Sequence, residues 1–434
     1  MTVKLLKTHY GSMVLFVLAF IPIIMWLQFA TIASVAASFG TLVASLGKAS
    51  ALSGIALYAL MPVLSMRHRV IEIIFGGLDK VYILHSKAGK ISFFLIMLHP
   101  LLLGAGRLLS GSNLVTIWDW WSLLILTGLV SLATLIFVTM ISLYSHIKHQ
   151  NWIWIHRLFG WILPIFFVHA LVARSQIVKN ELLLVYMIFL GLFGLSAFLY
   201  RSVFYTHFVR RYRYELSEIN NLSESVVEIV LKPTAVPINF QAGQFAYLSF
   251  ENPQIDSEAH PYSFSNANNG PYVRFTIKAL GDDTIKIKQL FPGTTAYVEG
   301  PYGMFSYKNV RNHKQVWIAG GIGITPFLSM ARSLSGKKHY DIRFYYGIES
   351  LDDAVFLQEF IDITRHIPEN FSTTVVSENI SGFVSVDLLK KSLQNLAEFD
   401  YMICGPPSMM KAIRQQLKQS GVEDSQIHIE SFSL

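Results

Sequence analysis

The sequence contains a single cysteine, Cys404, among its 434 residues. One cysteine excludes an intrachain disulfide and any metal site built from several thiolates. Acidic residues are scarce in the first half: residues 1–200 hold 13 Lys and Arg but 4 Asp and Glu, out of chain totals of 35 and 28. The excess positive charge therefore belongs to the first half alone. This distribution favours basic loops beside a bilayer over a nucleic-acid-binding surface.

Long apolar runs take the place of charge in that half. Hydrophobic residues make up 52% of the chain, and its mean hydropathy is +0.43. A helix needs about 20 apolar residues to cross a bilayer. Six stretches have roughly that length, namely 11–31, 50–66, 88–107, 121–145, 152–173 and 182–203. The sequence therefore predicts an all-α bundle of six transmembrane helices over residues 1–207. Residues 11–31 are long for the core of a cleavable signal peptide, so we expect none.

The short loops predict the orientation of this bundle, because Lys and Arg concentrate on the cytosolic side. With the N-terminus inside, the cytosolic segments carry thirteen Lys and Arg, and the outer loops carry only Lys48, Arg107, Arg174 and Lys179. This asymmetry places everything after residue 205 in the cytosol. We therefore expect an integral protein of the inner cell membrane, whose second half is cytosolic.

Four histidines lie in or beside the apolar stretches, His85 and His99 in one, His156 and His169 in another. A coordinating side chain at membrane depth is costly and usually marks function. His85 and His99 are fourteen residues apart, and His156 and His169 are thirteen apart. Either spacing corresponds to roughly 20 Å along a helix. We therefore predict that His85 with His156, and His99 with His169, supply axial ligands to two irons, one near each face. The alternative is that these histidines only hydrogen-bond to neighbouring helices.

Helix periodicity supports this pairing in one helix more than in the other. Fourteen residues leave His85 and His99 about 40° apart around the helix axis, so nearly on one face. Thirteen residues leave His156 and His169 about 140° apart. Pro164 lies between the second two, and a proline kink there can re-aim one imidazole.

The second half begins with short strands of alternating apolar residues, which predict an antiparallel barrel over residues 208–308. In His260-Pro261-Tyr262-Ser263-Phe264 an aromatic ring and a hydroxyl follow one another, as suits a flavin that is stacked and hydrogen-bonded. A basic residue and a glycine turn, Lys278 and Gly281, suit a pyrophosphate. Gly300-Pro301-Tyr302-Gly303 closes the segment. Taken alone, each of these patterns is also common as plain structure.

From about residue 313 strands alternate with helices, which predicts a parallel α/β sheet over residues 309–434. Gly320-Gly321-Ile322-Gly323-Ile324-Thr325-Pro326 lies between a strand and a helix, where backbone amides can meet a pyrophosphate. Cys404-Gly405-Pro406-Pro407 follows a later strand in the same way. The glycines of the first turn are not spaced as in the GxGxxG fingerprint. The prediction of a dinucleotide site therefore depends on the two turns occurring together in this order.

Together these motifs resemble the ferredoxin–NADP reductase superfamily in the second half, and NADPH oxidases (NOX) and transmembrane ferric reductases along nearly the whole chain. The resemblance implies a ferric-reductase-like di-haem domain, an FAD-binding β-barrel domain and an NAD(P)H-binding α/β domain. It implies FAD, two haem b, and NADH or NADPH as the electron donor. The donor would meet Gly320, Gly321, Gly323, Thr325 and Pro326, with Cys404, Gly405 and Pro406 beside the nicotinamide.

The same resemblance assigns the flavin site and the catalytic residues. Tyr262 and Ser263 would contact the isoalloxazine and ribityl of FAD, and His260 and Pro261 precede them on the strand, His260 where soluble relatives often have arginine. Lys278, Gly281 and Thr284 would face the FAD phosphates. Phe432 is the candidate for an aromatic that covers the flavin, although it is not the last residue. The catalytic residues implied are Ser263, Cys404 and Phe432.

One departure from the family concerns the coenzyme. NADPH-preferring relatives carry a basic residue just after the second strand of the α/β domain, where this chain has Gly347-Ile348-Glu349-Ser350. A carboxylate there would repel a 2′-phosphate and could accept a hydrogen bond from a ribose hydroxyl. Phe383, in the next turn, adds no charge. We predict that NADH serves at least as well as NADPH.

The predicted activity is electron transfer from cytosolic NAD(P)H through FAD and two haems to an acceptor at the outer face. Dioxygen, giving superoxide, and a ferric chelate are the two acceptors considered, with Arg107 and Arg174 near that face. An electron-delivery subunit for a periplasmic protein is an alternative from another class, although the short outer loops offer little surface for it. The sequence does not require a protein partner.

Overall fold

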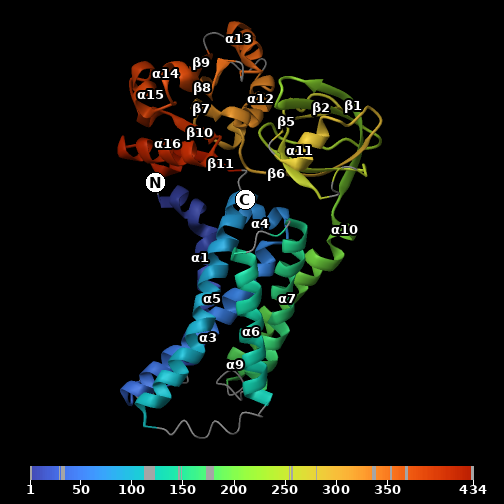
Figure 1. Ribbon diagram of the computed structural model, residues 1–434. Coiled ribbons are helices and arrows are strands. Elements are labelled where there is room, and N and C mark those ends of the chain that lie inside the picture. The colour runs from blue at the N-terminus through green and yellow to red at the C-terminus, as the bar shows by residue number, and fades with distance from the viewer. Residues whose placement is uncertain are drawn as a thin grey trace. The chain divides into compact units, whose positions relative to one another are not determined.

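The computed structural model describes residues 2–28, 30, 35–111, 123–144, 147, 149–172, 180–253, 255, 258–279, 281–334, 339–351, 354–366 and 370–431. The chain divides into two compact units (Figure 1). One unit comprises Leu6–Gly76 and Lys80–Phe208 and is helical. The other comprises Val209–Leu434 with the short pieces Met1–Leu5 and Gly77–Asp79, and contains all the described strands.

Among the described residues, six helices of the first unit are long and apolar enough to cross a membrane. They are α1 (Thr2–Leu27), α3 (Phe39–Leu64), α5 (Leu78–Leu109), α6 (Leu123–Tyr144), α7 (His149–Val172) and α9 (Glu181–Leu199), and the shorter α4 (Arg69–Phe75) and α10 (Tyr205–Phe208) accompany them. The number agrees with the prediction from the sequence. Large apolar side chains cover their outer surfaces, for example Phe94, which is 61% exposed, and Val185, which is 64% exposed.

Three of these helices, α1, α3 and α5, begin about ten residues earlier than the hydropathy indicates. Helix α3 starts after Ser38, whose Oγ accepts a hydrogen bond from the Thr41 backbone N–H while Thr41 Oγ1 accepts one from the Ser38 N–H. This reciprocal cap satisfies donors that a helix start otherwise leaves open. Polar residues in the first turns, such as Lys48 and Lys80, dilute the apolar signal without interrupting the helix.

The helices approach one another closely where glycines face their neighbours. A Cβ placed on Gly160 of α7 would lie 2.1 Å from the Phe198 ring of α9, and one on Gly194 of α9 would lie 2.2 Å from the Ala59 carbonyl oxygen of α3. Helix α6 packs along α7, and α3 along α9. Such small-residue contacts hold apolar helices together by dense packing where the hydrophobic effect offers little.

The second unit begins with the predicted antiparallel barrel. Its strands are β1 (Arg211–Asn221), β2 (Val226–Pro233), β3 (Phe245–Phe250), β4 (His260–Ser263), β5 (Val273–Lys278) and β6 (Thr295–Tyr302), in the order β4-β3-β6-β1-β2-β5. The pairing of β1 with β2 is irregular between Leu216 and Glu218. A short helix, α11 (Asp282–Ile287), follows β5.

The rest of this unit is the predicted parallel α/β sheet. Its strands are β7 (Lys314–Gly320), β8 (Asp341–Ile348), β9 (Phe371–Ser377), β10 (Asp400–Cys404) and β11 (Ile427–Glu430), in the order β11-β10-β7-β8-β9. The helices are α12 (Thr325–Arg332), α13 (Leu357–His366), α14 (Glu378–Ser381), α15 (Val386–Ser392) and α16 (Pro407–Gln419). Strand order reverses between β7 and β10, and ligands of such sheets bind at the carboxyl ends of the strands beside that reversal.

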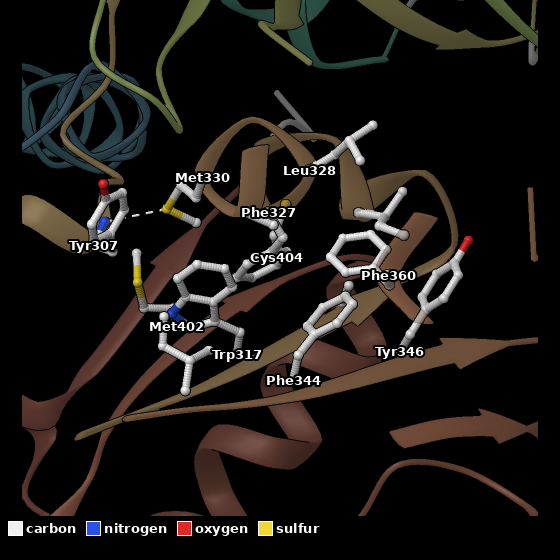
Figure 2. Close-up of a cluster of buried hydrophobic side chains, with 14 of the residues drawn as sticks. Tyr307, Trp317, Phe327, Leu328, Met330, Phe344, Tyr346, Phe360, Met402 and Cys404 are labelled. Carbon is white, nitrogen blue, oxygen red and sulfur yellow. Dashed lines mark hydrogen bonds between the residues drawn. The ribbon is translucent and has the colours of Figure 1, made fainter. Parts of the chain in front are cut away.

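The core of the α/β sheet is aromatic. Trp317 of β7, Phe344 of β8 and Phe360 of α13 are completely buried, and Figure 2 shows their rings gathered beside Phe327 of α12. Burying a ring of this size contributes roughly 3 kcal/mol or more. This dense core fixes the strand ends from which the two glycine turns project.

Candidate functional site

The two glycine turns of the α/β sheet meet at the carboxyl ends of β7 and β10. A Cβ added to Gly320 would lie 2.8 Å from Pro406 Cδ, and one added to Gly323 would lie 2.5 Å from the Cys404 carbonyl oxygen. A Cβ on Gly405 would lie 3.0 Å from Gly320 Cα. Only glycine permits backbones to approach this closely. The structure thus brings together the two motifs that the sequence analysis assigned to the nicotinamide dinucleotide.

The approach to the first turn is open. Gly321 adopts φ +52°, which favours glycine, and a Cβ there would meet nothing within 4 Å. Helix α12 begins directly afterwards at Thr325, with Pro326 in its first turn, where a missing N–H costs nothing. Thr325 Oγ1 donates to the Ile322 carbonyl at 3.2 Å, so the hydroxyl is held locally. The roles of these residues toward a dinucleotide remain predictions.

The flavin strand of the prediction is β4. It pairs with β3, so that Ser263 lies opposite Phe245 and Tyr262 opposite Ala246, while His260 and Pro261 form its first two residues. Ser263 is buried, and its Oγ has no hydrogen-bond partner among the described residues. An unsatisfied buried hydroxyl costs about 1–3 kcal/mol, which a ligand at this position would offset. The strand therefore fits a bound FAD.

The predicted phosphate loop follows β5. Lys278 is the last residue of that strand and is half-buried, and a Cβ on Gly281 would meet nothing within 4 Å. Thr284 Oγ1 accepts from the Gly281 N–H at 2.9 Å and donates to the Gly281 carbonyl at 2.8 Å. The threonine hydroxyl is thus used to shape the loop, and its contact with a phosphate remains a prediction.

A buried carboxylate, Glu430, lies between the barrel and the glycine turns of the α/β sheet, and the sequence analysis did not identify it. Glu430 ends β11 beside Cys404 of β10, and a Cβ on Gly303 would lie 3.6 Å from Glu430 Oε1. Gly303 in turn packs against the ring of Phe245, the strand neighbour of Ser263. Glu430 therefore lies where the closing turn of the barrel meets the second glycine turn. No local sequence pattern marks a glutamate at the end of a four-residue strand.

Cys404 is enclosed rather than exposed. It is 1% exposed and lies in the aromatic cluster with Phe327 and Met402 (Figure 2). Burial, and secondly the charge of Glu430, raise the pKa of the Cys404 thiol well above its usual value. The thiol is therefore protonated at neutral pH, so it is not a thiolate nucleophile. Its place beside a nicotinamide remains a prediction.

Three other predicted residues have different outcomes. Phe432 lies outside the described residues. Glu349 is exposed just after β8, and its carboxylate makes no hydrogen bond or ion pair with the described residues. Phe383 is 70% exposed in the turn before α15. The last two positions are accessible to a coenzyme, as the prediction of coenzyme choice requires.

In the helical unit the four predicted histidines lie on α5 and α7, and two of them face each other. The ring centres of His85 on α5 and His156 on α7 are 6.1 Å apart, with an interplanar angle of 50°. His99 and His169 lie on the same two helices, fourteen and thirteen residues further along the chain. Helix α7 is continuous through Pro164. The structure brings His85 and His156 together as predicted, and the pairing of His99 with His169 remains a prediction.

The second ring nitrogen of each histidine has its own surroundings. His85 Nδ1 donates to the Met61 carbonyl at 3.1 Å, and His99 Nδ1 donates to the Gly47 carbonyl at 2.9 Å. Because a carbonyl only accepts, both Nδ1 atoms carry the proton and both Nε2 atoms keep a free lone pair. His156 Nδ1 has no partner among the described residues, and its ring stacks on Trp152 at 4.6 Å.

A glycine on α6 makes room for the fourth imidazole. A Cβ on Gly128 would lie 2.7 Å from His169 Cε1 and 3.1 Å from His169 Nδ1. Thr127, the preceding residue, places its Oγ1 3.4 Å from the same Nδ1. The sequence analysis missed both residues, because neither a glycine nor a threonine in an apolar helix signals such a contact.

An arginine connects the barrel to the α/β sheet. Arg332, at the end of α12, forms two bonds to Glu359 of 2.6 and 2.8 Å and donates to the Ser265 carbonyl of the barrel at 2.7 Å. It also lies 3.5 Å from Glu228 of β2, which is almost fully buried and is held by Arg274 at 3.2 Å. The glycine turn and this ion-pair network thus occupy opposite ends of one short helix.

We expect Arg332→Ala to destabilise the second unit by about 3 kcal/mol, because it leaves the buried Glu228 with one cation instead of two. Thermal unfolding of the whole protein in detergent, followed by flavin fluorescence, measures the effect. Arg414→Ala is the control: Arg414 makes a similar bidentate pair with Asp424, but both side chains are more than a third exposed, so the loss should stay within about 1 kcal/mol. Equal shifts for the two variants would contradict the expectation.

Comparisons with known proteins agree with this geometry. Residues 211–306 match the family of FAD-binding domains, and residues 317–415 match the family of oxidoreductase NAD-binding domains. The chain is 30% identical over 210 residues to the glycine betaine monooxygenase reductase subunit of Chromohalobacter salexigens, a match covering 44% of this chain and 56% of that protein. It is 26% identical over 231 residues to the 2-halobenzoate 1,2-dioxygenase electron transfer component of Burkholderia cepacia, covering 50% and 67%.

Among solved structures, a flavohemoglobin from Malassezia yamatoensis superposes with a TM-score of 0.54 at 16% identity, covering 90% of this chain and 99% of that one. That likeness concerns the fold alone. The chain spans a little over half of the first relative and two thirds of the second. The two domain matches and the two joined glycine turns agree: the chain carries an FAD-binding domain and an oxidoreductase NAD-binding domain.

Proposed function

We propose that the protein is a transmembrane oxidoreductase that passes electrons from cytosolic NAD(P)H through FAD and two b-type haems to an acceptor at the outer face. Dioxygen, giving superoxide, is the acceptor we propose first. The observation that carries this proposal is the pair formed by His85 of α5 and His156 of α7, with His99 and His169 further along the same two helices. The haems, when bound, supply one-electron transfer, and the flavin supplies the step from hydride to single electrons.

The spacing of the first pair fits an iron with two axial imidazoles. An iron bonded to two ring nitrogens at about 2 Å each needs ring centres about 6 Å apart, and His85 and His156 are separated by 6.1 Å. The protonated Nδ1 of His85 and of His99 leaves Nε2 as the ligand atom in both. The fourteen residues between these histidines set two irons roughly 20 Å apart along the bundle, within one bilayer thickness.

The residues of the second unit serve binding and orientation in this proposal. The open turn at Gly321 and the start of α12 receive the dinucleotide phosphates. The buried Ser263 hydroxyl orients the flavin, and Glu430 lies within reach of the place where nicotinamide and flavin meet. The neutral Cys404 thiol adds no charge beside the nicotinamide, so it would not disturb a cationic product ring.

Two other acceptors remain alternatives. A ferric chelate could be reduced by the same electron path. The relatives are named as reductase and electron transfer components of oxygenase systems. Their names favour electron delivery to a partner protein as the alternative from another class. The bilayer is supported by six helices of sufficient length and hydropathy and by the basic cytosolic segments.

The test is a spectrum and an acceptor assay on the purified protein in detergent with added FAD. We expect two b-type haems per chain, reducible by NADH, and oxidation of NADH by dioxygen that yields a product removed by superoxide dismutase. Ferric citrate under anaerobic conditions tests the chelate. A protein without haem after expression with haem supply would contradict the proposal. Haem reduction with neither superoxide nor ferrous product would favour a partner protein.

A further inference from the structure

Helix α3 contacts α5 through one straight row of hydrogen bonds. His85 Nδ1 donates to the Met61 carbonyl at 3.1 Å, Ser92 Oγ to the Gly54 carbonyl at 2.8 Å, and His99 Nδ1 to the Gly47 carbonyl at 2.9 Å. The three donors are seven residues apart on α5, and the three acceptors are seven residues apart on α3. Because seven residues are nearly two helical turns, each set lies on one face of its helix.

Small residues on α3 let its carbonyls come within reach. A Cβ on Gly47 would lie 3.0 Å from Leu102 Cβ and 3.2 Å from the His99 carbonyl oxygen. A Cβ on Gly54 would lie 2.9 Å from Ile96 Cγ1 and 3.2 Å from the Ile96 backbone nitrogen. The two helices therefore touch backbone to backbone at both levels, which fixes their distance as well as their register.

The row does something that helix packing alone does not require: it sets the same tautomer and orientation on both α5 histidines. On α7, His156 Nδ1 has no partner in the described part of the chain, and Thr127 Oγ1 lies 3.4 Å from His169 Nδ1. A ligating imidazole whose other nitrogen donates to a carbonyl is more basic and is held in one orientation.

Resting on the proposed haem function, we infer that α3 is the positioning scaffold of both haem sites, and that Ser92 is a positioning residue shared by them. Ser92 is completely buried and lies midway between His85 and His99, seven residues from each. Without the hydrogen bond from Ser92 Oγ to the Gly54 carbonyl, α5 would no longer be held in register with α3 at the centre of the row. Gly47, by contrast, acts at the His99 level only.

The experiment compares three variants of the whole protein in detergent: Gly47→Ala, Ser92→Ala and Ser53→Ala. Ser53 is the matched control, since it is buried on α3 and its hydroxyl has no hydrogen-bond partner among the described residues. The readouts are haem content, the electron paramagnetic resonance signals of the ferric haems, which report imidazole orientation, and a redox titration of each haem.

Gly47→Ala should shift the resonance signal of one haem, raise its midpoint potential because the imidazole becomes less basic, and weaken its binding about 10–100-fold. Ser92→Ala should shift both haems by smaller amounts, and Ser53→Ala should shift neither. If Gly47→Ala and Ser92→Ala show the resonance signals and potentials of the wild type, α3 is not the positioning scaffold. Two bound haems in these variants would still agree with the proposed function. An equal effect of Gly47→Ala on both haems would show that the Gly47 carbonyl does not act through His99 alone. A wild type without haem would overturn both proposals.

Discussion

Replacing His169 with alanine is expected to remove one of the two haems and to lower reduction of the outer acceptor by about 100-fold or more. Loss of a group that only orients a metal ligand already costs about 10–100-fold in affinity or activity, and loss of the ligand itself should cost at least that. Alanine is a mild replacement here, because the imidazole lies over Gly128 and its removal leaves space without a clash.

The flavin and coenzyme sites belong to the other compact unit, so their chemistry should survive in this variant. Reduction of FAD by NADH under anaerobic conditions, measured by stopped flow, should proceed at the wild-type rate. Haem content, measured as a haemochrome, should fall from two to one per chain. The control is His207→Ala, which removes an exposed histidine on α10 and should keep both haems. A His169→Ala protein with two haems and full acceptor reduction would show that this histidine is not a ligand.

The histidine pairs show what a sequence can and cannot predict. Spacing placed His85 and His99 on one face of a helix, and the structure agrees, because helix period is a local property. The partners of their Nδ1 atoms were unpredictable, since the acceptors are backbone carbonyls of Met61 and Gly47 and every residue has a carbonyl. Which carbonyls meet a histidine depends on how two helices pack, and that depends on glycines whose spacing has many other uses.

The same division holds in the second unit. Strong local patterns, alternating strands and glycine turns after strands, predicted the barrel and the parallel sheet. The sequence analysis assigned the two glycine turns to one dinucleotide, and the structure brings Gly320 beside Gly405. Glu430 was missed because its position depends on strand order: β11 is the last strand of the chain but lies beside β10 at the sheet edge. Arg332 was missed for a similar reason, since three of its partners, Ser265, Glu228 and Glu359, come from separate segments.

Coenzyme choice is expected to follow the charge at Glu349. Its backbone carbonyl accepts from the Asn379 N–H at 3.3 Å and from Ser377 Oγ at 3.2 Å, so the turns after β8 and β9 adjoin. Glu378, between those two residues, is also exposed and adds a second negative charge to the same region. A carboxylate about 4 Å from a phosphate costs on the order of 1 kcal/mol for each pair of charges in water and more in partly wet surroundings.

Each 1.4 kcal/mol corresponds to about tenfold in affinity, so NADH should equal or exceed NADPH in kcat/KM for the wild type. Glu349→Arg should shift the ratio toward NADPH by about tenfold or more, because it removes a repulsion and adds a cation that can bind the 2′-phosphate in a bidentate manner. Steady-state kcat/KM for both coenzymes, in wild type and variant, measures the shift.

The charge-matched control is Glu398→Arg. Glu398 pairs with Lys314 at the amino ends of β7 and β10, opposite the glycine turns, so the coenzyme ratio should not change. A wild type with a strong preference for NADPH, or a ratio that Glu349→Arg leaves unchanged, would show that the Glu349 carboxylate points away from the bound coenzyme.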